Sequence, residues 1–253
     1  MWWKILLGLV LLVAAGATVA LRAGARRMGA WIDREVEAMI EALPPPATAP
    51  VSLDRFHGLP APVRRYLATV GVEGRPPVDF ARLRHGGSFS PDGGGRWMPS
   101  RGEEYFTRRP PAFLWAASIR AAPGLSVLAR DTYAGGSGNM LVTLAGLVPI
   151  QDVRGPELDA ASLLRWLSEL PVLPSALLPD EHLSWEAVDD SSARARVRHG
   201  GIEVSGVYSF GDDGLPTGFS ARRYRTEGDR QVEREWEGWY RDYREVEGLL
   251  VPG

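Results

Sequence analysis

The chain has 253 residues, a formal net charge of −2, 45% hydrophobic and 24% charged residues, and no cysteine. This composition is typical of a globular protein, and it excludes a disulfide framework, thiolate chemistry and a thiolate metal site. Arginines are interleaved with acidic residues, so the basic footprint of a nucleic-acid-binding protein is missing and we expect no nucleic-acid partner.

The beginning of the chain predicts a membrane segment. No charged residue occurs from Ile5 to Leu21, and Trp2 and Trp3 precede this run. A helix needs about 20 apolar residues to cross a bilayer, and tryptophan suits the headgroup layer. We therefore expect residues 1–22 to contact the lipid bilayer as a single-pass anchor. The alternative is a cleaved signal peptide with its cleavage site at 15–17.

A helical pattern continues beyond the apolar run. Apolar residues recur at spacings of three and four, as on one helical stripe, at Met28, Ile32, Val36, Met39 or Ile40, and Leu43. The prolines at 44–46 then end the helix. This continuity favours an uncleaved anchor that extends into a juxtamembrane helix.

The chain divides into three parts. Residues 1–43 are predicted as the anchor and juxtamembrane helix, 44–54 as a proline-rich linker, and 55–253 as one β-rich domain. The arginines that follow the apolar run favour a cytoplasmic domain by the positive-inside rule. The resemblance described below favours the extracytoplasmic side, and that is the side we expect.

The domain is dominated by short segments in which apolar and polar residues alternate. These segments lie at 83–89, 96–106, 113–120, 125–133, 140–150, 183–188, 193–198, 202–210, 219–224 and 236–240. Turn residues separate them, notably at 91–95, 135–139, 200–201 and 212–214. This arrangement predicts an antiparallel sheet or barrel.

Two helices are expected within the domain. The first covers residues 59–67, and the second begins at Asp159 as its N-cap and ends at Pro171. The apolar stretch at 172–178 should either bury against the sheet or cover something. The predicted fold class is therefore α+β, a curved antiparallel sheet with one or two covering helices behind a transmembrane helix.

Two families resemble parts of this sequence. The hairpin at 210–216 and the segment 236–248 resemble the closing hairpins of the LolA-like family of periplasmic lipoprotein carriers and lipid-binding lipoproteins. Longer stretches resemble an uncharacterised bacterial family that has an N-terminal membrane segment and the same order of motifs, namely 94–106, 130–133, 152–156 and 185–193.

The carrier resemblance implies a half-open antiparallel barrel whose concave face holds acyl chains under helical covers, with Leu163–Leu178 as one cover. Members of the uncharacterised family usually continue past Gly253, which implies an open sheet edge at the end of this chain. Neither resemblance transfers a functional motif residue by residue.

Motifs for common catalytic classes are missing. The sequence has no phosphate-binding P-loop, no dinucleotide-binding glycine fingerprint and no Gly-x-Ser-x-Gly elbow. The histidines never occur at the i, i+4 spacing of a helical zinc site, and they are His57, His85, His182 and His199. We therefore expect no metal and no cofactor.

Charged residues within apolar strands are the polar candidates for a binding site. Glu104, Asp131, Asp152 and Arg154 are predicted to surround a cavity mouth and to recognise a polar headgroup. A carboxylate among apolar neighbours is costly unless it is paired, and its pKa can rise. The alternative is a set of satisfied ion pairs that hold the strand register.

Aromatic residues are the apolar candidates. Trp97, Trp115, Tyr133, Trp166 and Trp185 are predicted to line an apolar pocket for a lipid-like ligand. The alternative is an ordinary core, because tryptophans bury large areas in any fold.

These observations favour non-catalytic binding of an apolar or amphipathic, lipid-like molecule near the membrane. Two alternatives stay open. One is a carboxylate-based enzyme with Glu104 and Asp131 as acid and base. The other is a structural subunit that pairs through its open sheet edge with a partner that the sequence does not identify.

Overall fold

The computed structural model describes residues 2–56, 58–90, 94–227 and 230–253. His57 and part of the predicted turn at 91–95 lie outside the described residues.

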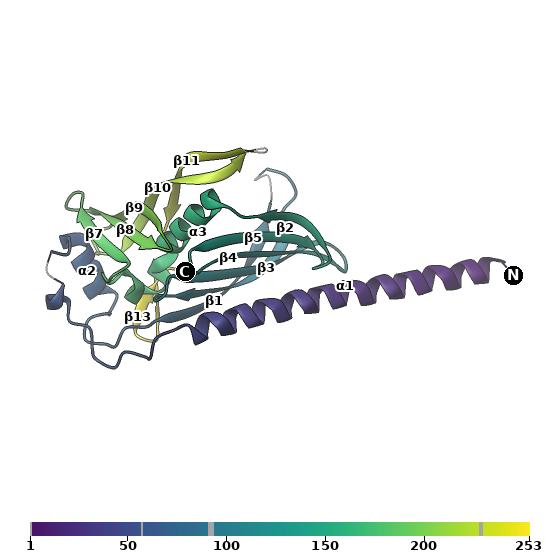
Figure 1. Cartoon of the computed structure of the whole chain (residues 1–253), viewed down its shortest axis with the longest axis horizontal. Coiled ribbons are helices and arrows are strands. Elements are labelled where there is room, and N and C mark those ends of the chain that lie inside the picture. The colour runs from purple at the N-terminus through teal and green to yellow at the C-terminus, as the bar shows by residue number, and fades with distance from the viewer. Residues whose placement is uncertain (1, 57, 91–93, 228–229) are drawn as a thin grey trace.

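The chain begins with one long helix, α1 (Trp2–Glu41). Its N-terminal half projects away from the domain, and its C-terminal half lies along a sheet (Figure 1). The predicted stripe is confirmed, because Ile32, Val36 and Met39 pack against Tyr105 and Leu114 of that sheet. The apolar half has a mean hydropathy of 2.3, so α1 is long and apolar enough to cross a membrane.

The sheet beneath α1, called sheet 1, is an antiparallel meander with its strands in chain order. Its strands are β1 (Phe80–Phe89), β2 (Met98–Thr107), β3 (Ala112–Ala122), β4 (Leu125–Ala134), β5 (Ser137–Leu144) and β6 (Val148–Val153). The β4–β5 hairpin turns at Gly135 and Gly136, both with positive φ, which tight hairpins require and glycine adopts without strain.

The remaining long strands form sheet 2, a second antiparallel meander. They are β7 (Leu183–Ala187), β8 (Ser192–His199), β9 (Ile202–Phe210), β10 (Pro216–Glu227) and β11 (Arg230–Trp239). A small hairpin follows, β12 (Arg244–Val246) with β13 (Leu249–Val251). The predicted α+β class with antiparallel strands is confirmed. The strands nevertheless form two open main sheets and not one curved sheet, because a long helical segment separates β6 from β7.

That helical segment lies between the sheets (Figure 1). It contains α3 (Pro156–Glu169) and the 3₁₀ turns η2 (Leu170–Val172) and η3 (Pro174–Leu177). The prediction of Asp159 as the N-cap is wrong. The helix begins at Pro156, which fits the first helical turn, and Asp159 instead accepts a hydrogen bond from the Gly138 backbone N–H at 2.6 Å.

Two shorter helices, η1 (Leu53–Arg55) and α2 (Ala61–Thr69), contribute buried residues to the same core, among them Tyr66 and Leu67. Between the sheets, Leu163 and Leu167 of α3 are fully buried against Phe113 of sheet 1 and Tyr208 of sheet 2. Side chains of the chain itself therefore occupy the space that the carrier resemblance assigned to acyl chains. A ligand-binding site has to be sought at the surface of the domain.

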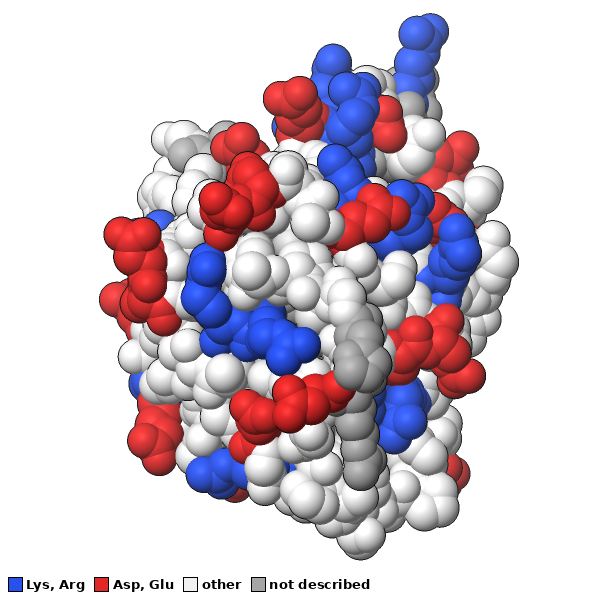
Figure 2. Space-filling view, turned by 90° about the vertical axis from the view of Figure 1, so that its left-hand side faces the viewer, with Lys and Arg blue, Asp and Glu red and all other residues white. Residues whose placement is uncertain are grey.

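Charge is mixed over the end of the domain opposite the N-terminus of α1. Figure 2 shows acidic and basic side chains interspersed on this face, with no continuous basic field over the residues that the structure describes there.

Candidate functional site

The structure brings three of the predicted site residues together on the face of sheet 1 that contacts α3. Glu104 of β2 is paired with Trp115 of β3, and Trp115 is paired with Asp131 of β4. Arg165 of α3 reaches this row. Its guanidinium donates to Glu104 at 2.7 Å, to Asp131 at 2.8 Å and to Glu169 at 3.0 Å. We call Glu104, Asp131, Arg165 and Glu169 the Arg165 cluster.

Packing also holds the guanidinium in place. Its carbon lies 5.0 Å from the ring centroid of Phe113 and 5.4 Å from that of Trp115, both within cation–π distance. Every nitrogen of the Arg165 guanidinium thus donates to a carboxylate while aromatic rings flank it. This arrangement matches the ion-pair alternative, because Arg165 is engaged by three carboxylates, although Asp131 Oδ1 and Glu169 Oε2 are buried without a hydrogen-bond partner among the described residues.

Two carboxyls of the Arg165 cluster have raised pKa values. Burial, followed by the charge of Glu169, raises the pKa of Glu104 to about 9, although Arg165 opposes the shift. This shift favours a proton held between the carboxyls of Glu104 and Glu169, and Glu169 Oε2 has no other hydrogen-bond partner among the described residues. Burial also raises the pKa of Asp131, against the opposing effect of Arg165.

This raised pKa predicts a pH dependence of stability. The carboxyl of Glu104 releases its proton near pH 4.5 when unfolded and near pH 9 when folded. Its contribution to the free energy of unfolding is therefore full below pH 4.5 and falls as pH rises toward 9, by at most about 1.4 kcal/mol per pH unit. Glu104→Gln keeps a neutral hydrogen-bonding group and should flatten this slope in urea unfolding between pH 5 and 9.

Glu233→Gln is the control, because Glu233 lies in an exposed pair with Arg222 and should leave the slope unchanged. Equal slopes for wild type and Glu104→Gln would show that Glu104 is already ionised in the folded protein.

The other two charged candidates lie elsewhere. Asp152 is on the opposite face of sheet 1, where it accepts a hydrogen bond from Asn139 at 2.7 Å. Asn139 in turn accepts from Arg130, and Arg130 pairs with Glu35 of α1. Arg154 is an exposed side chain 3.5 Å from Asp152. The single cavity mouth predicted around Glu104, Asp131, Asp152 and Arg154 is therefore wrong. Asp152 lies across from Leu141, which lies across from Arg130, and Arg130 faces the side of the sheet opposite to its neighbour Asp131.

The pairing of Arg130 with Glu35 was not predicted from the sequence. The adjacency of Arg130 and Asp131 was the available signal, since adjacent residues of a strand point to opposite faces. Nothing in the sequence indicated that α1 would supply the partner for Arg130.

The aromatic candidates are mainly packing residues. Trp166 is buried with its indole N–H bonded to the Thr107 carbonyl at 3.0 Å, and Trp185 donates to the Leu177 carbonyl at 2.9 Å. Tyr133 is buried, with its hydroxyl 2.9 Å from Nδ1 of His199. Trp97 is 61% exposed and does not join the others.

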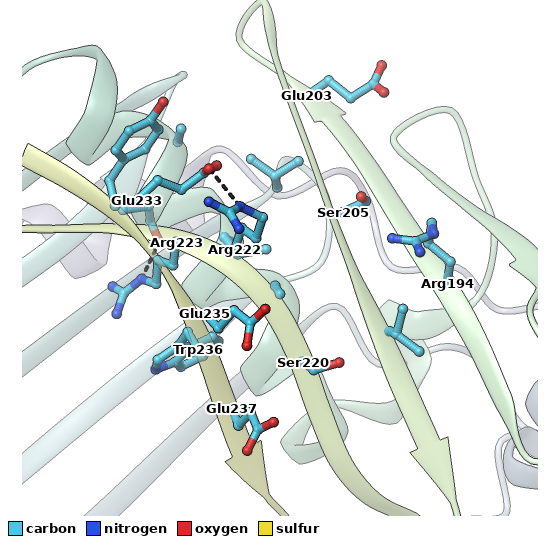
Figure 3. A pocket seen from close by; sticks show the side chains of 17 residues that line it. Arg194, Glu203, Ser205, Ser220, Arg222, Arg223, Glu233, Glu235, Trp236 and Glu237 are labelled. Carbon is cyan, nitrogen blue, oxygen red and sulfur yellow. Dashed lines mark hydrogen bonds and ion pairs between the residues drawn. The ribbon is translucent and has the colours of Figure 1, made fainter.

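A polar cleft opens in sheet 2, where β10 and β11 diverge from β9 (Figure 3). It has a volume of about 590 Å³, and its walls carry both arginine and glutamate side chains. Arg222 pairs with Glu233 at 2.8 Å, while Arg223 donates to the Ala161 carbonyl at 3.1 Å and lies over the ring of Trp236. Glu203, another wall residue, pairs with Arg196 and Arg198, so part of the charge of this cleft is matched within the protein itself.

A second depression lies between α1 and sheet 1, and we call it the juxtamembrane groove. Its volume is about 440 Å³. Small and apolar residues from both elements line it, namely Ala25, Met28, Gly29 and Ile32 from α1, and Ala116, Ala117, Leu128 and Ala129 from sheet 1. The short side chains of Ala25 and Ala116, together with Gly29, leave this space between the helix and the sheet unfilled.

Charged side chains form one rim of the juxtamembrane groove. Arg84 pairs with Glu103 at 2.9 Å, and Arg101 is exposed beside them. The Tyr105 hydroxyl and Arg82 hold the pKa of Glu103 at about 2, so this carboxylate stays ionised. Arg84 is thus already paired, and Asp33 also lines the groove, so the exposed guanidinium of Arg101 is the group best placed to contact an anion while the walls contact apolar chains.

Of the comparisons with known proteins, only the comparison with family models found a match. No curated protein and no solved structure matches the chain, so the resemblance to lipoprotein carriers is not confirmed. A sequence model described as a family of unknown function, DUF6544, matches residues 49–253. The chain thus belongs to this uncharacterised family, as its longer motifs indicated.

Proposed function

We propose that this protein is a membrane-anchored domain that binds an amphipathic, lipid-like molecule in the juxtamembrane groove. The observation that carries the proposal is the position of an apolar groove directly beside the helix that is able to cross a membrane. In this proposal the apolar half of α1 is an uncleaved single-pass anchor.

The groove would begin close to the bilayer. Ala25 lies three residues beyond Arg22, the first charged residue after the apolar run, which is about 5 Å along a helix. The polar layer of a bilayer is of that order of thickness on each side. Either orientation of the anchor would place the mouth of the groove against the adjacent leaflet.

The apolar walls of the groove suit the acyl chain of a lipid-like ligand, and its charged rim suits the polar headgroup. An acyl chain would contact Met28, Ile32 and Leu128, and a phosphate or carboxylate would meet Arg84 and Arg101. The volume of about 440 Å³ is in the range of small-molecule sites and accommodates part of an acyl chain. Binding of this kind requires no bond to be made or broken.

Gly29→Leu should block the groove. An added Cβ at Gly29 meets no atom within 4 Å, so the substitution is tolerated, and the leucine side chain would occupy space between the helix and the sheet. We expect photo-crosslinking of a diazirine-acyl phosphatidylglycerol to the peptide that contains residues 116–129 to fall about tenfold, which corresponds to about 1.4 kcal/mol of binding free energy.

Gly16→Leu is the matched control, because Gly16 also has open space around it but lies in the apolar half of α1. Arg84→Gln should weaken crosslinking by a smaller factor, whereas Arg222→Gln, in another exposed cross-strand pair, should not. Unchanged crosslinking in both Gly29→Leu and Arg84→Gln would contradict a ligand in this groove.

A further inference from the structure

The turn between β5 and β6 is exposed and apolar. Leu147 is 43% exposed, Val148 56% and Ile150 59%. They lie together on or beside β6, which is an edge strand of sheet 1. A cluster of large apolar side chains at a sheet edge is usually covered, either by protein or by lipid.

Close backbone packing fixes this turn against α1. An added Cβ at Gly24 would lie 2.5 Å from the Ala145 carbonyl oxygen and 2.6 Å from the Leu147 side chain. Likewise, an added Cβ at Gly146, which has a φ of 72°, would clash with the carbonyl oxygen of Gly24. Glycine at both positions permits this approach, so the height of the turn along α1 is defined.

That height coincides with the end of the apolar run. Gly24 lies three residues beyond Leu21, which is about 5 Å along the helix axis. Figure 1 agrees, because the end of sheet 1 that points toward the N-terminus of α1 lies beside the middle of that helix. If α1 crosses the bilayer, the turn lies in the headgroup layer, which is roughly 5–8 Å thick on each side.

Charge at this level of the molecule also suits a lipid surface. Arg22, Arg26 and Arg27 follow the apolar run, and Arg120 lies near the end of β3, close to the β3–β4 turn at the same end of sheet 1. These side chains are exposed and can contact lipid phosphates while the apolar turn contacts the upper parts of acyl chains.

We infer that Leu147, Val148 and Ile150 form a second membrane contact, which inserts into the interface of the leaflet from which α1 emerges. This inference rests on the anchor of the proposed function. Together, the helix and the turn would hold sheet 1 at a fixed tilt and direct the mouth of the juxtamembrane groove toward the lipid.

The absence of cysteine makes a direct test possible in the full chain. Single variants Leu147→Cys, Ile150→Cys, Val188→Cys and Val13→Cys would each carry an environment-sensitive fluorophore in liposomes of phosphatidylcholine and phosphatidylglycerol. Val188 is the matched control, because it is 50% exposed and follows β7, at the opposite end of the domain.

We expect a headgroup nitroxide lipid to quench about half of the emission at 147 and 150, since both would lie within the polar layer, and iodide to quench it only weakly. The label at 188 should show the reverse. The label at 13 should be quenched by a nitroxide on the acyl chain.

The possible failures can be distinguished. Lipid quenching at 13 together with strong iodide quenching at 147 and 150 would overturn the second contact and leave the anchor in place. Protection of 147 and 150 from both quenchers would show that protein covers the turn, which also overturns the inference. Iodide quenching at 13 would overturn the anchor itself.

Discussion

Replacing Arg165 with methionine is expected to lower the free energy of unfolding by about 3–5 kcal/mol, the range found when one partner of a buried ion pair is removed. The substitution leaves three carboxyl groups, those of Glu104, Asp131 and Glu169, close together between sheet 1 and α3 without their shared cation. Their side chains are only 12%, 10% and 31% exposed, so water replaces the guanidinium poorly. Urea unfolding of the full chain in detergent micelles, followed by tryptophan fluorescence, measures the effect.

Two further variants test the cause of this loss. Arg222→Met removes an arginine from an exposed pair and should change stability by less than about 1 kcal/mol. The double variant Arg165→Met/Asp131→Asn should recover part of the stability, because a carboxyl that pairs with Arg165 at 2.8 Å then cannot ionise. A loss below about 1 kcal/mol in Arg165→Met alone would mean that the carboxylates are solvated and that the cluster does not hold α3 to sheet 1.

Replacing Trp166 with alanine should lower the free energy of unfolding by a similar amount, about 3–5 kcal/mol, in the same urea measurement. Trp166 is 1% exposed and lies on α3 between the sheets, so its removal leaves a cavity that surrounding strands cannot fill. The substitution also leaves the buried Thr107 carbonyl without the indole N–H that it accepts.

Phenylalanine at the same position separates these two effects. Trp166→Phe keeps much of the ring volume but removes the donor, and should lower stability by about 1–3 kcal/mol. Trp97→Ala is the control, because Trp97 is 61% exposed and should change stability by no more than about 0.5 kcal/mol. If Trp166→Ala were as mild as Trp97→Ala, the close packing between the sheets would be contradicted.

Local patterns in the sequence predicted much of the secondary structure. The alternation of apolar and polar residues marked the strands, and the glycine pairs at 135–136 and 200–201 adopt the positive φ that their hairpins need. The stripe from Met28 to Met39 marked the face of α1 that packs on sheet 1. These features depend on neighbours within a few residues, so the sequence by itself determined them.

Contacts between distant segments decided the rest. The partition of the strands into two sheets follows from where α3 packs, and periodicity carries no information about that position. Glu104 and Asp131 were chosen as candidates from their apolar surroundings, but Arg165 joins them only because α3 lies across β2 and β4. The juxtamembrane groove likewise exists only because a helix rests on a sheet with small residues between them. Such sites depend on three-dimensional shape and on long-range ion pairs, and only the tertiary structure determines these.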